Sequence, residues 1–198
     1  MKLSRQNLIQ AQAQREKGNR MIYSLTSTGF KRSISEEKVM KRVQLKSDSL
    51  EHDLTLLQIK RRFKDLKMVQ GFYSENLILS GVLDNILEIK QLRELRPDAI
   101  IKVIINNKTL FLPLEYEASS KYSRRNEKLL AKYYTSPFVP AVVFISKNES
   151  IQKRICSKEI QRSSKKSEKF YYALLENVLS PQEKIPLTNI KKEVLNLS

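Results

Sequence analysis

The chain has 198 residues, of which 40% are hydrophobic, and its 37 basic and 21 acidic residues give a formal net charge of +16. This length allows one sizeable domain with a packed core, and the charge favours polyanionic partners, with nucleic acid ahead of anionic membranes and acidic proteins. The single cysteine, Cys156, excludes an intramolecular disulfide, and the lack of a Cys/His cluster argues against structural zinc. Neither a signal-peptide core nor an apolar run of about 18 residues occurs, so we expect a cytoplasmic protein that does not enter a membrane.

The beginning of the chain predicts a helix followed by β-structure. Residues 4–17 have a weak apolar side, with Ser4 placed to cap the helix and Gly18 placed to end it. The run "RMIYSLTSTGFKRS" that follows is typical of strands, with a turn at Gly29. Residues 31–48 are polar, and we expect them to connect this part to the rest of the chain.

Two helices are predicted next. The first covers about residues 48–66, where Asp48 and Glu51 resemble a capping box and apolar residues recur at helical spacing. The segment "GFYSENLILSGVLDNILEIKQLREL" predicts the second helix, and Pro97 ends the helical pattern. The expected buried side of this second helix consists of Val82, Leu83, Ile86 and Leu87.

From Asp98 onward the pattern changes to strands. The runs "DAIIKVII" and "TLFLPLEYE" flank "NNK", a connection typical of a hairpin because asparagine tolerates positive φ. Then follow an amphipathic helix, "KYSRRNEKLLAKYY", a third strand, "PAVVFISKN", and a further helix, "SEKFYYALLENVL". The order helix, hairpin, helix, strand predicts an α/β or α+β domain. We interpret residues 181–198 as a weakly ordered tail.

The second strand of the hairpin carries two glutamates on one face. Residues i and i+2 of a strand face the same way, so Glu115 and Glu117 project together, and the hairpin can bring Asp98 near Glu115. Three carboxylates at one sheet edge repel each other unless a cation neutralises them, and hard cations such as Mg²⁺ take oxygen ligands. The sequence therefore predicts a metal site here. The alternative is a set of strand-end carboxylates that are satisfied by solvent or by Lys102 and Lys121.

Basic residues follow these acids along the predicted helix. Steps of four, three and four residues place Lys121, Arg125, Lys128 and Lys132 on one helix face. Such a face suits a phosphodiester substrate whose flanking phosphates it would hold, although a solvated helix face explains it as well. The residues predicted to contact nucleic acid are Arg20, Lys31, Arg32, Arg124, Arg125, Lys128 and Lys132.

The sequence "RPDAII…LPLEYEASSK" resembles the active-site signature of the PD-(D/E)xK nuclease superfamily, an aspartate after proline followed by acid-x-lysine on the next strand. Glu117 stands where lysine is usual, as in some members, and Lys121 lies one helical turn further on. The resemblance implies a restriction-endonuclease-like core, a mixed sheet flanked by helices, with Mg²⁺ or Mn²⁺ as cofactor. It also implies that Asp98 and Glu115 bind the metal, that Glu117 binds it or orients water, and that Lys121 stabilises developing charge.

Over roughly residues 20–150 the chain is similar to the replication-relaxation family of plasmids and mobile elements, whose members join a winged helix-turn-helix to a nuclease-like domain. "YSLTSTGFKR" resembles the wing, "EHDL" the start of the next helix, and "EYEASSKYSRRNEKLLAKYY" the closing strand and helix. "FYSENLI" supplies Glu75, which the resemblance makes a third metal ligand. The implied organisation is a truncated winged-helix-like segment and linker at 1–46, a nuclease-like domain at 47–180 and a tail at 181–198.

The function predicted from these features is that of a DNA-binding protein with a metal-dependent deoxyribonuclease domain, serving a plasmid or mobile element. A homodimer and partner proteins of a mobile-element or defence system are further expectations. Two alternatives stay open: a catalytically inactive DNA-binding factor on the same fold, and a basic adaptor for an acidic protein. His52, the only histidine, is interpreted as a capping or packing residue, and Cys156 as inert.

Overall fold

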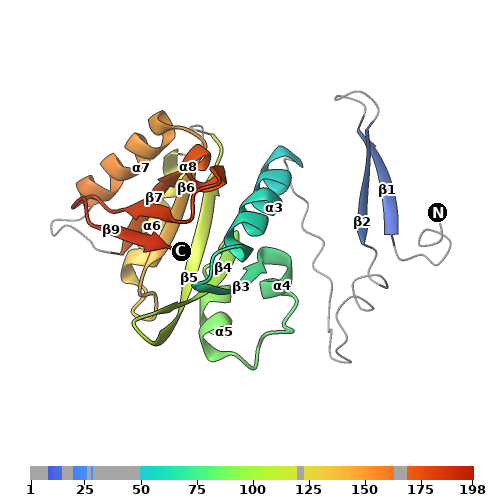
Figure 1. Cartoon of the computed structure of the whole chain (residues 1–198), viewed down its shortest axis with the longest axis horizontal. Helices are drawn as coiled ribbons and strands as arrows, with labels where there is room; N and C mark the ends of the chain where they lie inside the picture. The colour runs from blue at the N-terminus through green and yellow to red at the C-terminus, as the bar shows by residue number, and fades with distance from the viewer. Residues whose placement is uncertain (1–8, 15–19, 26–27, 29–49, 120–122, 163–168) are drawn as a thin grey trace.

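The computed structural model describes residues 9–14, 20–25, 28, 50–119, 123–162 and 169–198 (Figure 1). Strands β1 (Ile9–Gln14) and β2 (Arg20–Leu25) form an antiparallel two-stranded sheet. The helix predicted over residues 4–17 is therefore wrong from Ile9 to Gln14, where "IQAQAQ" alternates with the period of two that favours a strand. The strand character of β2 is confirmed, and the remainder of the predicted winged-helix-like segment falls outside the described residues.

The main sheet has seven strands in the order β3-β4-β5-β6-β7-β8-β9. Strands β3 to β5 pair antiparallel, β5 to β7 pair parallel, and β7 to β9 pair antiparallel again. This arrangement confirms the predicted α+β class with a mixed sheet flanked by helices. The bounds are β3 (Val69–Ser74), β4 (Ala99–Ile105), β5 (Lys108–Glu117), β6 (Val142–Ser146), β7 (Phe170–Leu174), β8 (Ile185–Thr188) and β9 (Val194–Leu197).

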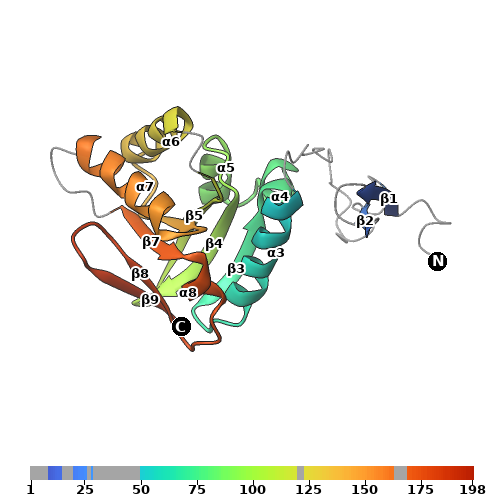
Figure 2. The same ribbon diagram turned by 90° about the horizontal axis from the view of Figure 1, so that it is seen from above.

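Helices cover both faces of this sheet (Figure 2). One core contains Ile59 of α3 and Val178 of α8, and the other contains Ile78 of α4, Leu130 of α6 and Ile155 of α7. No helix in the described part of the chain is both long and apolar enough to cross a membrane. The bounds are α3 (Leu50–Lys64), α4 (Glu75–Leu79), α5 (Leu87–Arg93), α6 (Ser123–Thr135), α7 (Glu149–Arg162) and α8 (Leu175–Leu179).

The hairpin of β4 and β5 forms as the sequence predicts. Asn106 and Asn107 connect the strands with φ angles of 50° and 60°, the left-handed conformation that asparagine tolerates. Leu112 and Leu114 enter one core while Phe111 enters the other, which confirms the predicted alternation of faces. β6 pairs with β5 from Leu114 onward, so the proline at 113 precedes the ladder on that side.

The sheet curls, so that its two edge strands approach each other at one end. The backbone N–H of Met68, just before β3, donates to the carbonyl of Ser198, just after β9, at 2.6 Å. Ile185, Leu187 and Leu197 from the last two strands are fully buried in the core that also holds α3. The expectation of a weakly ordered tail over 181–198 is therefore wrong.

Two predicted helices begin instead with strands. In the second predicted helix, β3 comes first, α4 follows, and α5 begins only at Leu87, whose side chain is 63% exposed rather than buried. The helix predicted from "SEKFYYALLENVL" starts as β7, where Phe170 and Tyr172 are buried with Tyr171 between them half-buried, and only then becomes α8. In both segments adjacent aromatic residues, which favour strands, precede a short helix.

Candidate functional site

Asp98 directly precedes β4, and Glu115 lies in β5, at the end of the central hairpin. The last pair of the β4–β5 ladder is Ala99 with Leu114, so the next position along sets Asp98 opposite Glu115. Asp98 Oδ2 accepts a hydrogen bond from the backbone N–H of Tyr116 at 2.8 Å, and its carbonyl accepts one from the N–H of Glu75 at 3.0 Å. These bonds fix both the backbone and the carboxylate of Asp98 against the adjoining strands.

Glu115 is held from the other side by a tyrosine of α6. The carboxylate is buried, with 5% of the residue exposed, and its Oε1 accepts a hydrogen bond from the Tyr133 hydroxyl at 2.5 Å. Burial, followed by the charges of Glu115 and Asp98, raises the pKa of Tyr133 well above 10, so the hydroxyl keeps its proton and donates it. Tyr133 is fully buried in the core on this face of the sheet, and it is also the donor that satisfies Glu115.

His52 approaches the carboxylate of Asp98 from the first turn of α3. Its Nε2 lies 3.2 Å from the Tyr116 carbonyl oxygen and 3.7 Å from Asp98 Oδ2, and its ring centroid lies 5.2 Å from that of Tyr116. The carboxylates of Asp53 and Asp98 raise the pKa of His52 to about 10, so the imidazole is positively charged at neutral pH. His52 is thus a site residue that the sequence patterns do not indicate, because none of them links it to Asp98, 46 positions away.

Two other predicted acids have partners of their own. Glu117 Oε1 accepts a hydrogen bond from the Ser119 N–H at 3.3 Å, and its carbonyl accepts one from the N–H of Lys147 after β6. Glu75 begins α4 and forms an ion pair with Arg96 at 3.4 Å. The backbone of Glu75 therefore adjoins Asp98, while its carboxylate is paired with arginine.

The predicted nucleic-acid contacts are described only in part. The side chains of Lys128 and Lys132 are exposed on α6. Arg20 lies in β2 and Arg124 and Arg125 lie in the first turn of α6, but their side chains are outside the described part of the structure. Three further predicted residues lie wholly outside the described residues, namely Lys31, Arg32 and Lys121.

Asp98 and Glu115 supply carboxylate oxygens, which are donors of the kind that Mg²⁺ takes. Within the described residues, no three His, Cys, Asp or Glu side chains are grouped in a way that could hold a metal ion. Mg²⁺, however, is commonly bound by one or two carboxylates together with water and substrate phosphates. Asp98 and Glu115, two carboxylates at the same end of the hairpin, fit that smaller requirement in kind and number.

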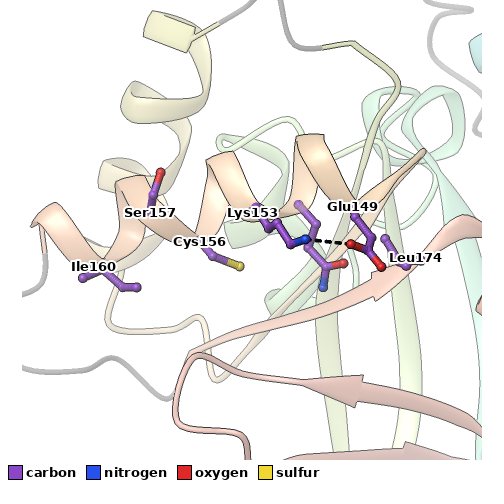
Figure 3. A pocket seen from close by; sticks show the side chains of 7 residues that line it. Glu149, Lys153, Cys156, Ser157, Ile160 and Leu174 are labelled. Carbon is purple, nitrogen blue, oxygen red and sulfur yellow. Dashed lines mark hydrogen bonds and ion pairs between the residues drawn. The ribbon is translucent and has the colours of Figure 1, made fainter.

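A hollow elsewhere on the surface contains none of the predicted site residues. It has a volume of about 460 Å³ and lies along α7, where Glu149, Lys153, Cys156 and Ile160 line it together with Leu174 (Figure 3). Burial raises the pKa of the Cys156 thiol to about 11, so the thiol stays protonated at neutral pH. An unreactive thiol gives this hollow no evident chemistry, and we place the candidate site at Asp98 and Glu115.

Comparisons of the chain with protein-family models, with curated proteins and with solved structures found no match.

We expect the single imidazole of this chain to stay protonated up to about pH 9. Because the folded pKa of about 10 exceeds the ordinary value of 6.5, the stabilisation from charged His52 is fully present below pH 6.5 and is lost as the pH rises through 10. An NMR titration of its ring protons measures the midpoint directly. Asp98→Asn should lower it, while Asp84→Asn, which breaks only the Arg93 pair, should not. A midpoint near 6.5 in the unaltered protein would contradict this arrangement.

Proposed function

We propose that this chain is a DNA-binding protein whose sheet domain is a metal-dependent nuclease that hydrolyses phosphodiester bonds. The observation that carries the proposal is the placement of Asp98 opposite Glu115, two restrained carboxylates at the end of the central hairpin. A mixed sheet with helices on both faces is also the architecture that the resemblance to the PD-(D/E)xK superfamily implies. The net charge of +16 supports DNA as the substrate.

The chain's own residues would prepare the site in three ways. The Tyr116 N–H and the Tyr133 hydroxyl hold Asp98 and Glu115 in fixed orientations, which lowers the cost of ordering them around a cation. The charged imidazole of His52 places positive charge beside Asp98, in a site whose signature lysine is replaced by Glu117. Glu117, one strand position beyond Tyr116, would orient water. A bound Mg²⁺ or Mn²⁺ would activate that water and stabilise charge on the scissile phosphate.

A second candidate function is a DNA-binding replication or mobilisation factor of a plasmid or mobile element, on the same fold but without catalysis. Two observations favour it. Glu117 occupies the position of the signature lysine, and the described residues contain no group of three metal-ligating side chains. In that protein Asp98 and Glu115 would serve only to hold the hairpin, α3 and α6 together.

Cleavage of supercoiled plasmid and of labelled single strands, with Mg²⁺, Mn²⁺ or EDTA, separates the two functions. We expect Asp98→Asn and Glu115→Gln to lower the cleavage rate at least about 100-fold while DNA affinity persists, because the metal contributes several kcal/mol of charge stabilisation. Glu88→Gln, at an exposed position of α5, is the matched control and should cleave normally. If the unaltered protein binds DNA but cleaves it with neither metal, the nuclease proposal is rejected and the non-catalytic DNA-binding factor is the function that remains.

A further inference from the structure

The second half of α3 presents a row of positively charged side chains to solvent. Its inner side is anchored in the core by Ile59 and Phe63, both 0% exposed, and Leu66 just beyond the helix is 3% exposed. This anchoring leaves Arg61, Lys64 and Lys67 exposed and Lys60 half-buried. We call these four residues the α3 ridge: Lys60, Arg61, Lys64 and Lys67.

The ridge has no acidic partner among the described residues. None of the ion pairs between described side chains includes a ridge residue, although pairs occur at both the start of α3 and on α7. Arg62, in the middle of the same run, behaves differently, because its guanidinium donates to the carbonyls of Ser180 and Gln182. Arg62 is thus structural, whereas the ridge side chains make no comparable contact with the described core.

Repulsion among these positive charges destabilises the helix, and the helix dipole offsets this repulsion only in part. Lys60 and Lys64 are like charges at the i, i+4 spacing, which destabilises a helix. Burial, and then the Lys64 ammonium, lower the pKa of Lys60. The dipole of α3 favours cations in its last turn, which contains Arg61 and Lys64, but neither Lys60 before that turn nor Lys67 beyond the helix benefits. An external polyanion would relieve the repulsion along the whole row.

Three of the four ridge residues lie on α3, the helix that also carries His52. His52, beside Asp98, precedes Lys60 by eight residues, so at 1.5 Å per residue the ridge begins about 12 Å along the helix axis. A duplex advances about 3.4 Å per base pair, so it covers this distance in about four base pairs. Measured along the helix axis, the ridge therefore begins within about four base pairs of the residue beside Asp98.

We propose that the α3 ridge binds the phosphate backbone of DNA, as a contact surface separate from the basic side of α6. The inference takes the identity of the polyanion from the proposed function, but it does not depend on catalysis. Lysine and arginine side chains that contact phosphates position DNA without reading its sequence. The ridge contact therefore contributes equally to the binding of every sequence.

The test measures DNA affinity of the full chain as a function of salt, by fluorescence anisotropy of a labelled duplex. In a variant with Lys60→Gln, Arg61→Gln and Lys64→Gln, we expect the slope of log K against log salt to shrink by about 2 to 3, since each lost phosphate contact removes about 0.9. Affinity at about 0.1 M salt should fall at least about tenfold. The matched control removes the same charge at exposed positions elsewhere, with Lys90→Gln, Lys108→Gln and Lys184→Gln.

The outcomes separate this inference from the proposed nuclease. Lys60→Arg with Lys64→Arg keeps the charge and should keep the affinity, and equal thermal midpoints for all variants exclude unfolding as the cause. Ridge-dependent binding without cleavage supports the ridge and rejects the nuclease. If the protein cleaves DNA and the ridge and control variants have equal slopes of log K against log salt, the proposed ridge contact is overturned. Binding to phosphatidylserine vesicles in the absence of DNA binding also overturns it.

Discussion

Replacing Leu197 by alanine should lower the free energy of unfolding by about 3 kcal/mol. The side chain is 0% exposed and packs in the core formed by the last two strands and α3, and buried leucine-to-alanine changes cost about 2 to 5 kcal/mol. Urea unfolding followed by circular dichroism measures the loss. Val194→Ala is the matched control, because Val194 lies on the same strand but is 55% exposed, and its loss should stay below about 0.5 kcal/mol.

Removing residues 185–198 altogether should abolish cooperative folding. The deletion takes away three fully buried side chains, Ile185, Leu187 and Leu197, and the carbonyl partner of Met68. At about 1.5 to 3 kcal/mol for each buried aliphatic side chain, the loss approaches the total stability of an average domain. A truncated chain that unfolds at the same urea concentration as the intact chain would show that β8 and β9 are dispensable.

Changing Glu159 to glutamine should stabilise the protein above pH 7 and have little effect near pH 4. Glu159 is 2% exposed, and its Oε2 accepts a hydrogen bond from Tyr172 at 2.6 Å. Its Oε1 is buried and has no hydrogen-bond partner in the described structure. Burial raises the pKa of the carboxyl from 4.5 to about 7, although the Tyr172 bond opposes the shift.

The sign follows from proton linkage. Between pH 4.5 and 7 the folded carboxyl keeps a proton that the unfolded chain releases, so the stability of the unaltered protein falls across this interval. The total decline is about 3 kcal/mol, and it levels off above pH 7. Glutamine carries no charge, so its variant should not show this decline.

Urea midpoints at pH 5 and pH 8 test the Glu159 prediction. Glu149→Gln, on the same helix, is the control, because the exposed Glu149 pairs with Lys153, which lowers its pKa. The Glu149→Gln variant keeps Glu159, so its stability should fall between pH 5 and pH 8 as that of the unaltered protein does, with only a small loss from the exposed ion pair. Parallel pH dependences of the unaltered protein and Glu159→Gln would show that this carboxyl is not held protonated.

The elements that the sequence predicts correctly carry their signal locally. The two asparagines of "NNK" specify a tight turn, and the alternation in "TLFLPLEYE" puts Leu112 and Leu114 on one face and Phe111 on the other. Asp98 and Glu115 come to the same end of the hairpin for the same reason, since the register of a hairpin follows from its turn. This part of the candidate site therefore follows from the amino-acid sequence.

Short strands, and contacts between residues far apart in the chain, carry no such local signal. β8 and β9 have four residues each, which is too few to show a reliable period. They form strands because β8 pairs with β7 on one side and with β9 on the other. The sequence of β7 predicts a helix because a run of five apolar and aromatic residues fits the period of a helix as well as that of a strand. The apolar pattern of α7 is too weak to predict a helix, with Ile151 and Ile155 on its buried side.

The charge, the α+β class and the central hairpin with its pair of carboxylates follow from the sequence, because each depends on composition or on residues close together in the chain. The groups that hold those carboxylates are set by tertiary packing. His52 and Tyr133 come from helices on opposite faces of the sheet and reach Asp98 and Glu115 only once both cores have packed. Packing also makes the last two strands part of the core, because burial depends on what the rest of the chain places against them.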